Sequence, residues 1–293
     1  MRPPWHAVFV LAGSWLAAAP ATAFSLYGPS QDVVEAARWT DETGLADGLQ
    51  IGIDAGFVGA WGTITSDPAV VEGWVRTAFE AWESPVVQFD LRFGDLAGAD
   101  IVLEALPGAD PLGGFYGYAP ADWGHDASRV LTNGQTVPGY TIFGAEIDIA
   151  SERLQSVPGF ELLPLWIREG IVTRLLMHEI GHTLGLGHTN DPLNLYYDTD
   201  LDPNNEMVID PDDPFAGLVD SPNRLFATVM SPRPCVGGLE LCTALYTTYL
   251  SVDDAGGRDV LYPSPVPEPG ALGTLALAGA VTARAAARTR RRP

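Results

Sequence analysis

Hydrophobic and polar positions alternate in several short segments of the chain, a period of two that predicts β-strands. Residues 141–150, TIFGAEIDIA, alternate best, and residues 48–57 alternate weakly. Residues 86–93 and 100–105 form two further candidates, separated by a turn that contains glycine. The pattern therefore predicts four strands, with a long surface loop rich in Gly, Pro and aromatic residues at 106–139.

Other stretches follow the period of an α-helix. The first begins at Asp67, a good N-cap residue, and Pro68 suits the first helical position. Its apolar residues form one stripe that is expected to face the core: Val71, Trp74, Val75, Ala78, Phe79 and Trp82. A second, more apolar helix is expected within residues 165–186, and a shorter one from Ser251 to Tyr262.

Acidic residues dominate the charge of the chain. It holds 37 Asp and Glu against 16 Lys and Arg, a formal net charge of −21 at pH 7. Such a surface repels phosphate backbones, so nucleic acid is excluded as a partner. Many aspartates gather in residues 190–220, some two positions apart, which suits Ca²⁺; a merely solvated acidic loop is the alternative.

The first residues of the chain indicate export. Residues 1–23 combine Arg2, a short apolar run and the small-residue sequence Ala-Thr-Ala, as a signal peptide cleaved by signal peptidase does. The mature protein is then expected to begin near Phe24, a retained anchor being the alternative. Cys235 and Cys242 are the only cysteines, and in an exported chain they are most simply one disulfide, with two free thiols as the alternative.

The other end, residues 264–293, has a proline-rich spacer, a short apolar run and an arginine cluster. This order predicts transient contact with an inner membrane, the arginines remaining in the cytoplasm. It resembles the PEP-CTERM sorting signal of Gram-negative bacteria. That resemblance implies removal by an exosortase-like enzyme and release to the cell surface or the extracellular matrix; a plain tail anchor is the alternative.

The candidate chemistry is concentrated in the sequence HEIGHTLGLGH, which begins at His178. His178 and His182 are four apart, so on a helix both imidazoles lie on one face and reach a single metal ion. Gly185 lets the chain leave the helix, because a residue without Cβ tolerates a positive φ, and His188 is then the third ligand. Three imidazoles and a water are the coordination expected of a catalytic zinc. The alternative interpretation is that these are ordinary histidines of a helix without a metal.

Glu179 is the candidate general base. Its place between the two histidines turns the carboxylate away from direct ligation and towards a water in the metal's open position. Zinc lowers the pKa of that water and polarises a carbonyl, while Glu179 takes the proton and delivers it to a leaving amine.

The residues His178, Glu179, His182, Gly185 and His188 resemble the long zinc signature of the metzincins. The sequence ATVM, which ends at Met230, resembles their Met-turn, and implies that the Met230 thioether packs beneath the imidazoles. Within the metzincins, the segments at 75–93, 99–101 and 250–262 are similar to the matrixins.

The resemblance implies one α+β domain over residues 24–263, with a twisted, mostly parallel sheet, long helices and a loop-rich C-terminal part. It implies that strand 141–150 is a sheet edge at which an extended peptide pairs, a simple edge being the alternative. It further implies a secreted or surface zinc endopeptidase of protein or peptide substrates. The alternatives are a matrix-associated binding or scaffold protein with little turnover and, less favoured, a calcium-responsive adhesin.

Overall fold

The computed structural model describes much of residues 25–187 and three shorter stretches after them. The described residues are 25–26, 36–108, 111–112, 116–130, 136–187, 229–230, 250 and 252–263. The signal peptide, the sorting tail, the acidic segment, His188, Cys235 and Cys242 lie outside them, so these predictions stay predictions. In the described part, no helix has the length and apolar character needed to cross a bilayer.

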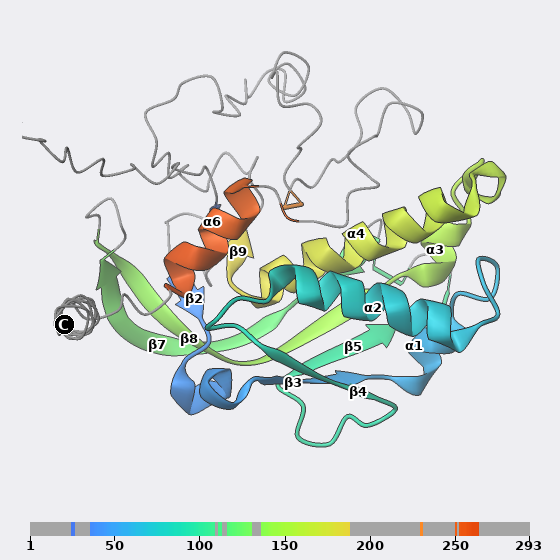
Figure 1. Ribbon diagram of the computed structural model, residues 1–293. Coiled ribbons are helices and arrows are strands. Elements are labelled where there is room, and N and C mark those ends of the chain that lie inside the picture. The colour runs from blue at the N-terminus through green and yellow to red at the C-terminus, as the bar shows by residue number, and fades with distance from the viewer. Residues whose placement is uncertain are drawn as a thin grey trace, which may run out of the picture.

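A mostly parallel sheet of seven strands forms one layer of the molecule (Figure 1). Its strands are β2 (Ala36–Arg38), β3 (Leu49–Ile53), β4 (Phe89–Phe93), β5 (Ile101–Ala105), β6 (Gly117–Tyr118), β7 (Ala121–Val130) and β8 (Thr136–Ile149). The strands that run parallel follow the order β2-β8-β5-β3-β4. The expected mostly parallel sheet with helices is confirmed, and the arrangement is consistent with an α/β fold.

The prediction that residues 141–150 form an edge of the sheet is wrong. β8 begins earlier, at Thr136, and β7 pairs antiparallel with its residues up to Ala145. β6 pairs antiparallel with its last two residues. Because β2 and β7 both pair with β8 at the same residues, they lie on opposite sides of it. The outer edge is therefore β6 and β7, in a segment expected to be a loop.

The other strand predictions are right in type and wrong at their ends. The strand expected at 48–57 ends at Ile53, because the Asp54 carboxylate accepts a hydrogen bond from the Gly56 amide at 2.6 Å and starts helix α1 (Ala55–Gly59). The strand expected at 86–93 begins only at Phe89.

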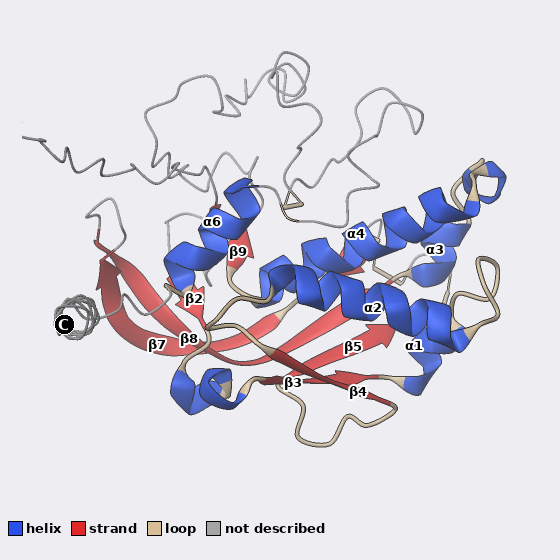
Figure 2. Cartoon of the chain, viewed as in Figure 1, coloured by secondary structure: helices blue, strands red, loops and turns tan. Residues whose placement is uncertain are grey.

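The two long helices agree with the apolar pattern that predicts them. Helix α2 (Pro68–Trp82) starts where expected, with the Asp67 carboxylate accepting from the Ala69 amide at 3.0 Å, and all six residues of its stripe are buried. Helix α4 (Leu165–Thr183) packs against α2, and both lie on the same face of the sheet (Figure 2). The short helix α3 (Ser151–Gln155) precedes α4 in the chain. Helix α6 (Val252–Leu261) is the last element of the described part.

Two buried tryptophans fix α4 in place. The Trp82 indole donates to the Met177 carbonyl at 2.8 Å, and the Trp39 indole donates to the Thr183 carbonyl at 2.8 Å. The Thr183 carbonyl lies at the end of the helix, where carbonyls have no partner within the helix. Both indoles are fully buried, so the second half of α4 is held rigidly at the point where the histidines lie.

Candidate metal centre

His178 and His182 lie side by side, one turn apart near the end of α4. Their Nε2 atoms are 3.2 Å apart, and their rings are nearly perpendicular, with centroids 4.7 Å apart. The expected convergence of two imidazoles on one face of a helix is therefore what the structure contains.

Backbone carbonyls fix the direction of both imidazoles. His178 Nδ1 lies 2.7 Å from the Val229 carbonyl oxygen, and His182 Nδ1 lies 2.7 Å from the Leu186 carbonyl oxygen. A carbonyl only accepts hydrogen bonds, so each Nδ1 carries the hydrogen and each Nε2 of a neutral ring presents a lone pair. This is the outer-shell arrangement that orients metal-ligating histidines elsewhere in proteins.

The spacing of the two lone pairs fits a metal ion. Two acceptor nitrogens at 3.2 Å repel each other unless a proton or a cation lies between them. Nitrogens that bind one tetrahedral zinc at about 2.0–2.1 Å lie about 3.3–3.4 Å from each other. The separation of the two Nε2 atoms is thus close to the separation that two nitrogen ligands of one zinc ion would have.

The third predicted ligand, His188, falls just beyond the described residues. Within the part of the chain that the structure describes, no three His, Cys, Asp or Glu side chains gather around one point. The chain nevertheless turns as expected after α4, since Gly185 has a φ of 93°. A Cβ on Gly185 would overlap the Ala37 carbonyl of β2, so the close approach of that strand requires glycine.

The segment that follows this turn belongs to a small sheet of its own. Strand β9 (Leu186–Gly187) pairs antiparallel with β1 (Ser25–Leu26). The Leu186 carbonyl of β9 is also the one that holds His182, so β1 supports a strand that orients a candidate ligand.

Glu179 is almost completely buried, with 4% of its surface exposed. Burial, and secondarily the negative charge of Asp148, raise the pKa of Glu179 to about 8. A cation bound by the neighbouring imidazoles would act in the opposite direction. The carboxylate lies against β6: a Cβ on Gly117 would overlap Oε1 and come within 2.6 Å of Cδ.

Met230 packs against α4 at Gly181, the residue before His182, and its place beneath the imidazoles stays a prediction. It is 2% exposed, and its thioether packs so closely on α4 that a Cβ on Gly181 would overlap Sδ. The Asp254 carboxylate of α6 accepts hydrogen bonds from the Val229 amide at 2.7 Å and the Met230 amide at 3.2 Å.

Two residues of this region are not identified by the sequence patterns. Asp254 is expected only at the start of a helix, and nothing local connects it with a turn 24 residues earlier. Arg174, one turn before His178 and 3% exposed, does leave a signal, because it is a charge inside an otherwise apolar helical stretch.

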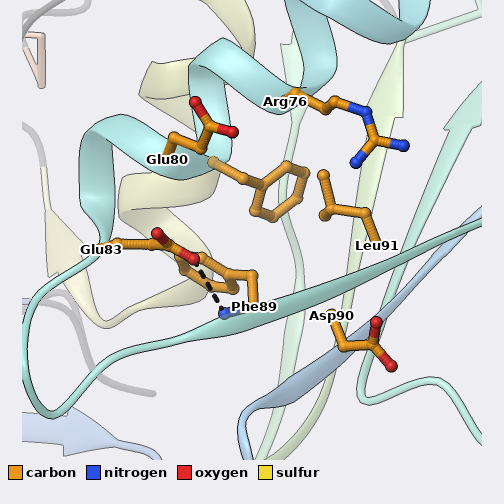
Figure 3. Close-up of a pocket in the computed structure, with 7 residues that line it drawn as sticks. Arg76, Glu80, Glu83, Phe89, Asp90 and Leu91 are labelled. Atoms are coloured by element: carbon orange, nitrogen blue, oxygen red, sulfur yellow. Dashed lines mark hydrogen bonds between the residues drawn. The ribbon is translucent and has the colours of Figure 1, made fainter.

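A separate small cavity, with a volume of about 200 Å³, lies between α2 and β4 and includes neither histidine (Figure 3). Its lining is formed by Arg76, Phe79, Glu80, Glu83, Phe89, Asp90 and Leu91. The Glu83 carboxylate accepts from the Phe89 amide at 3.4 Å, and the Arg76 guanidinium lies over the Phe93 ring, 5.0 Å from its centre. These contacts join helix to strand, and we assign the cavity no chemistry.

Comparison with known proteins adds no family: the chain matches none of the protein-family models, and no curated protein is significantly similar to it.

Proposed function

We propose that this chain is an exported zinc-dependent endopeptidase of the metzincin type, similar to the matrixins. One observation carries the proposal. Two imidazoles, each oriented by a backbone carbonyl at 2.7 Å, place their Nε2 atoms 3.2 Å apart, and Glu179, the residue after His178, is buried. These groups support the proposal because a catalytic zinc needs imidazole ligands and a nearby general base, and His188 is the third ligand in the proposal.

When bound, zinc supplies Lewis-acid polarisation of the scissile carbonyl and an acidic water. His178 and His182 would each bind the metal through the lone pair of a neutral Nε2 atom. The Val229 and Leu186 carbonyls keep the protons of these rings on Nδ1. Glu179 accepts the proton of the attacking water on its carboxylate and passes it to the nitrogen of the leaving amine. Its burial keeps bulk water from competing for that proton.

In this proposal, the edge of the sheet that binds the peptide substrate is β6 and not strand 141–150. Gly117 of β6 lies against the Glu179 carboxylate, and among the described strands β6 pairs only with β8. An extended peptide that added to the other side of β6 would present its backbone beside Glu179. Main-chain pairing of this kind binds peptides of many sequences.

The test compares Glu179→Gln with Glu169→Gln, a matched change on the same helix. Both variants are expected to retain one zinc per chain by elemental analysis. Only Glu179→Gln should lose the cleavage of casein, because it lacks the base. A wild-type protein without transition metal, or a Glu179→Gln variant that cleaves at the wild-type rate, would contradict the proposal.

A further inference from the structure

One peptide group joins a buried carboxylate to a candidate metal ligand. The peptide bond between Val229 and Met230 has a hydrogen-bonding partner at both ends. Its carbonyl oxygen lies 2.7 Å from His178 Nδ1, and its N–H donates to the Asp254 carboxylate at 3.2 Å. A trans peptide group is planar and directs its C=O and its N–H in opposite directions. The position of Asp254 therefore sets the direction in which the carbonyl meets the imidazole.

The other oxygen of Asp254 holds the preceding peptide group, because it accepts from the Val229 amide at 2.7 Å. Asp254 is 1% exposed and Val229 is 2% exposed, so bulk water does not compete for these bonds. An ionised carboxylate only accepts hydrogen bonds and suits two N–H donors, whereas an asparagine would turn its own NH₂ group towards one of them. A carboxylate is thus the side chain that this position requires.

The charge of Asp254 also acts on the imidazole. Hydrogen bonds to an ionised acceptor are stronger than those between neutral groups, and hydrogen bonds in a chain polarise one another. The bond from the Met230 N–H to Asp254 therefore makes the Val229 oxygen a better acceptor for the hydrogen on His178 Nδ1. A partner of this kind fixes the tautomer of a metal-ligating histidine and raises its basicity.

Helix α6 places this carboxylate, and the second imidazole is supported elsewhere. The Arg258 side chain of α6 donates to the Glu83 carbonyl at the end of α2, at 2.8 Å. His182 Nδ1 instead meets the Leu186 carbonyl of β9. A change at Asp254 is therefore expected to affect His178 and to spare His182.

We infer that Asp254 is a positioning residue of the metal centre, which acts through the Val229–Met230 peptide group to orient the His178 imidazole and to hold its hydrogen on Nδ1. The inference rests on the proposed function, since it takes His178 as a zinc ligand. Asp254 itself contacts neither metal nor substrate. Partners beyond the metal ligands are worth about 10- to 100-fold in metal affinity, and Asp254 acts through an intervening group, so we expect about 10-fold.

The test measures two properties of Asp254→Asn: the zinc dissociation constant, and the exchange with water of the imidazole Nδ1 hydrogens, observed by NMR in zinc-loaded protein with ¹⁵N-labelled histidine. Zinc binding should weaken about 10-fold. The His178 hydrogen should exchange roughly 10-fold faster, the factor that corresponds to one weakened hydrogen bond. The His182 hydrogen should exchange at the wild-type rate, which a general loosening of the fold would not allow.

Asp100→Asn is the matched control. The Asp100 carboxylate also accepts a hydrogen bond from a backbone amide that is distant in the sequence, that of Gln50 in β3, at 2.7 Å. This variant should leave the zinc dissociation constant and both exchange rates unchanged. If Asp254→Asn does not fold, Asp254→Ser replaces it with the same expected results, because the serine hydroxyl is uncharged and offers only one oxygen to the two amides.

The outcomes separate this inference from the proposed function. Wild-type zinc affinity and wild-type His178 exchange in a folded Asp254 variant, with zinc-dependent cleavage intact, overturn the inference alone. Equal acceleration of His178 and His182 also overturns it, because the effect is then not directed to one ligand. Fast exchange of the His178 hydrogen in the zinc-loaded wild-type protein overturns it without any variant. A wild-type protein that binds no zinc overturns the proposed function and the inference with it.

Discussion

Gly181 lies between the two candidate ligands in the sequence, and replacing it by alanine tests how closely Met230 and Trp82 pack against α4. A methyl group at this position would overlap Met230 Sδ and lie 2.9 Å from Cζ2 of Trp82. The Trp82 ring is fully buried and tied to the Met177 carbonyl, so it has no room to move aside. The flexible Met230 thioether must therefore shift.

Two opposing effects set the size of the change. Alanine is favoured over glycine in a helix interior by about 0.8–1.0 kcal/mol. Overpacking a tight core is unfavourable by about 1–3 kcal/mol. We therefore expect Gly181→Ala to lower the free energy of unfolding by roughly 0–2 kcal/mol.

Gly73→Ala is the matched control, because Gly73 is an exposed glycine of α2 and an added Cβ there would meet no packed neighbour within 4 Å. It should gain the full helix preference, so the two variants should differ by about 1–3 kcal/mol. In a domain of this size, each kcal/mol corresponds to a difference of about 2–4 °C in Tm. Urea unfolding of the full chain, in chelator, measures the gap.

Equal stabilisation by Gly73→Ala and Gly181→Ala would refute this reasoning. It would mean that a methyl group fits between α4, Met230 and Trp82 without displacing either side chain. The packing of Met230 and Trp82 against α4 would then be looser than these contacts require.

Three further predictions concern the site and its support. Gly117→Ala drives a methyl group into the Glu179 carboxylate and should lower kcat on the order of 10²-fold with zinc retained. The control is Gly124→Ala, where the nearest atom to the added methyl group is at an ordinary 3.5 Å, and it should leave kcat unchanged. Steady-state cleavage measures kcat, and metal analysis measures the zinc content. Tyr262→Phe removes the hydroxyl that donates to the Leu184 carbonyl at 2.9 Å and should lower the free energy of unfolding by about 1–3 kcal/mol. Burial raises the pKa of Tyr262, so the unfolded chain ionises first and wild-type stability should fall as pH rises above about 10; denaturant unfolding at several pH values should show a shallower fall in the variant. Removing zinc by dialysis against a chelator should abolish cleavage and lower Tm, and adding zinc should restore both; unchanged cleavage after removal would contradict the assignment of the metal.

Elements fixed by neighbouring residues were predictable from the sequence. The cap at Asp67 and the apolar stripe of α2 depend on spacings of three and four, and the structure matches them. The pairing of His178 with His182 depends on the same helical geometry. β7 was not predictable, because it has few apolar residues and its register shifts between Asp122 and Trp123 and again between Asp126 and Arg129, which breaks the alternation.

The edge of the sheet and the support of the histidines depend on partners far away in the chain. Strand 141–150 has the alternation of a strand with one buried face. This pattern is the same for a strand at the edge of a sheet and for a strand that pairs with a neighbour on each side. Likewise, the link between Asp254 and Met230 joins two short segments whose own sequences favour only a helix start and a turn. Such pairings follow from the assembled fold and not from local spacing.

The pairing of β1 with β9 joins segments that are about 160 residues apart. Closing a loop of that length is entropically unfavourable by about 4–5 kcal/mol, and the contact forms only after α4 has been synthesised. Ser25 and Leu26, although they are made early, therefore wait for Leu186 and Gly187 before they acquire a partner. A nascent chain arrested anywhere before this point lacks the strand that orients His182, so the proposed hydrolytic activity would be acquired late in biosynthesis.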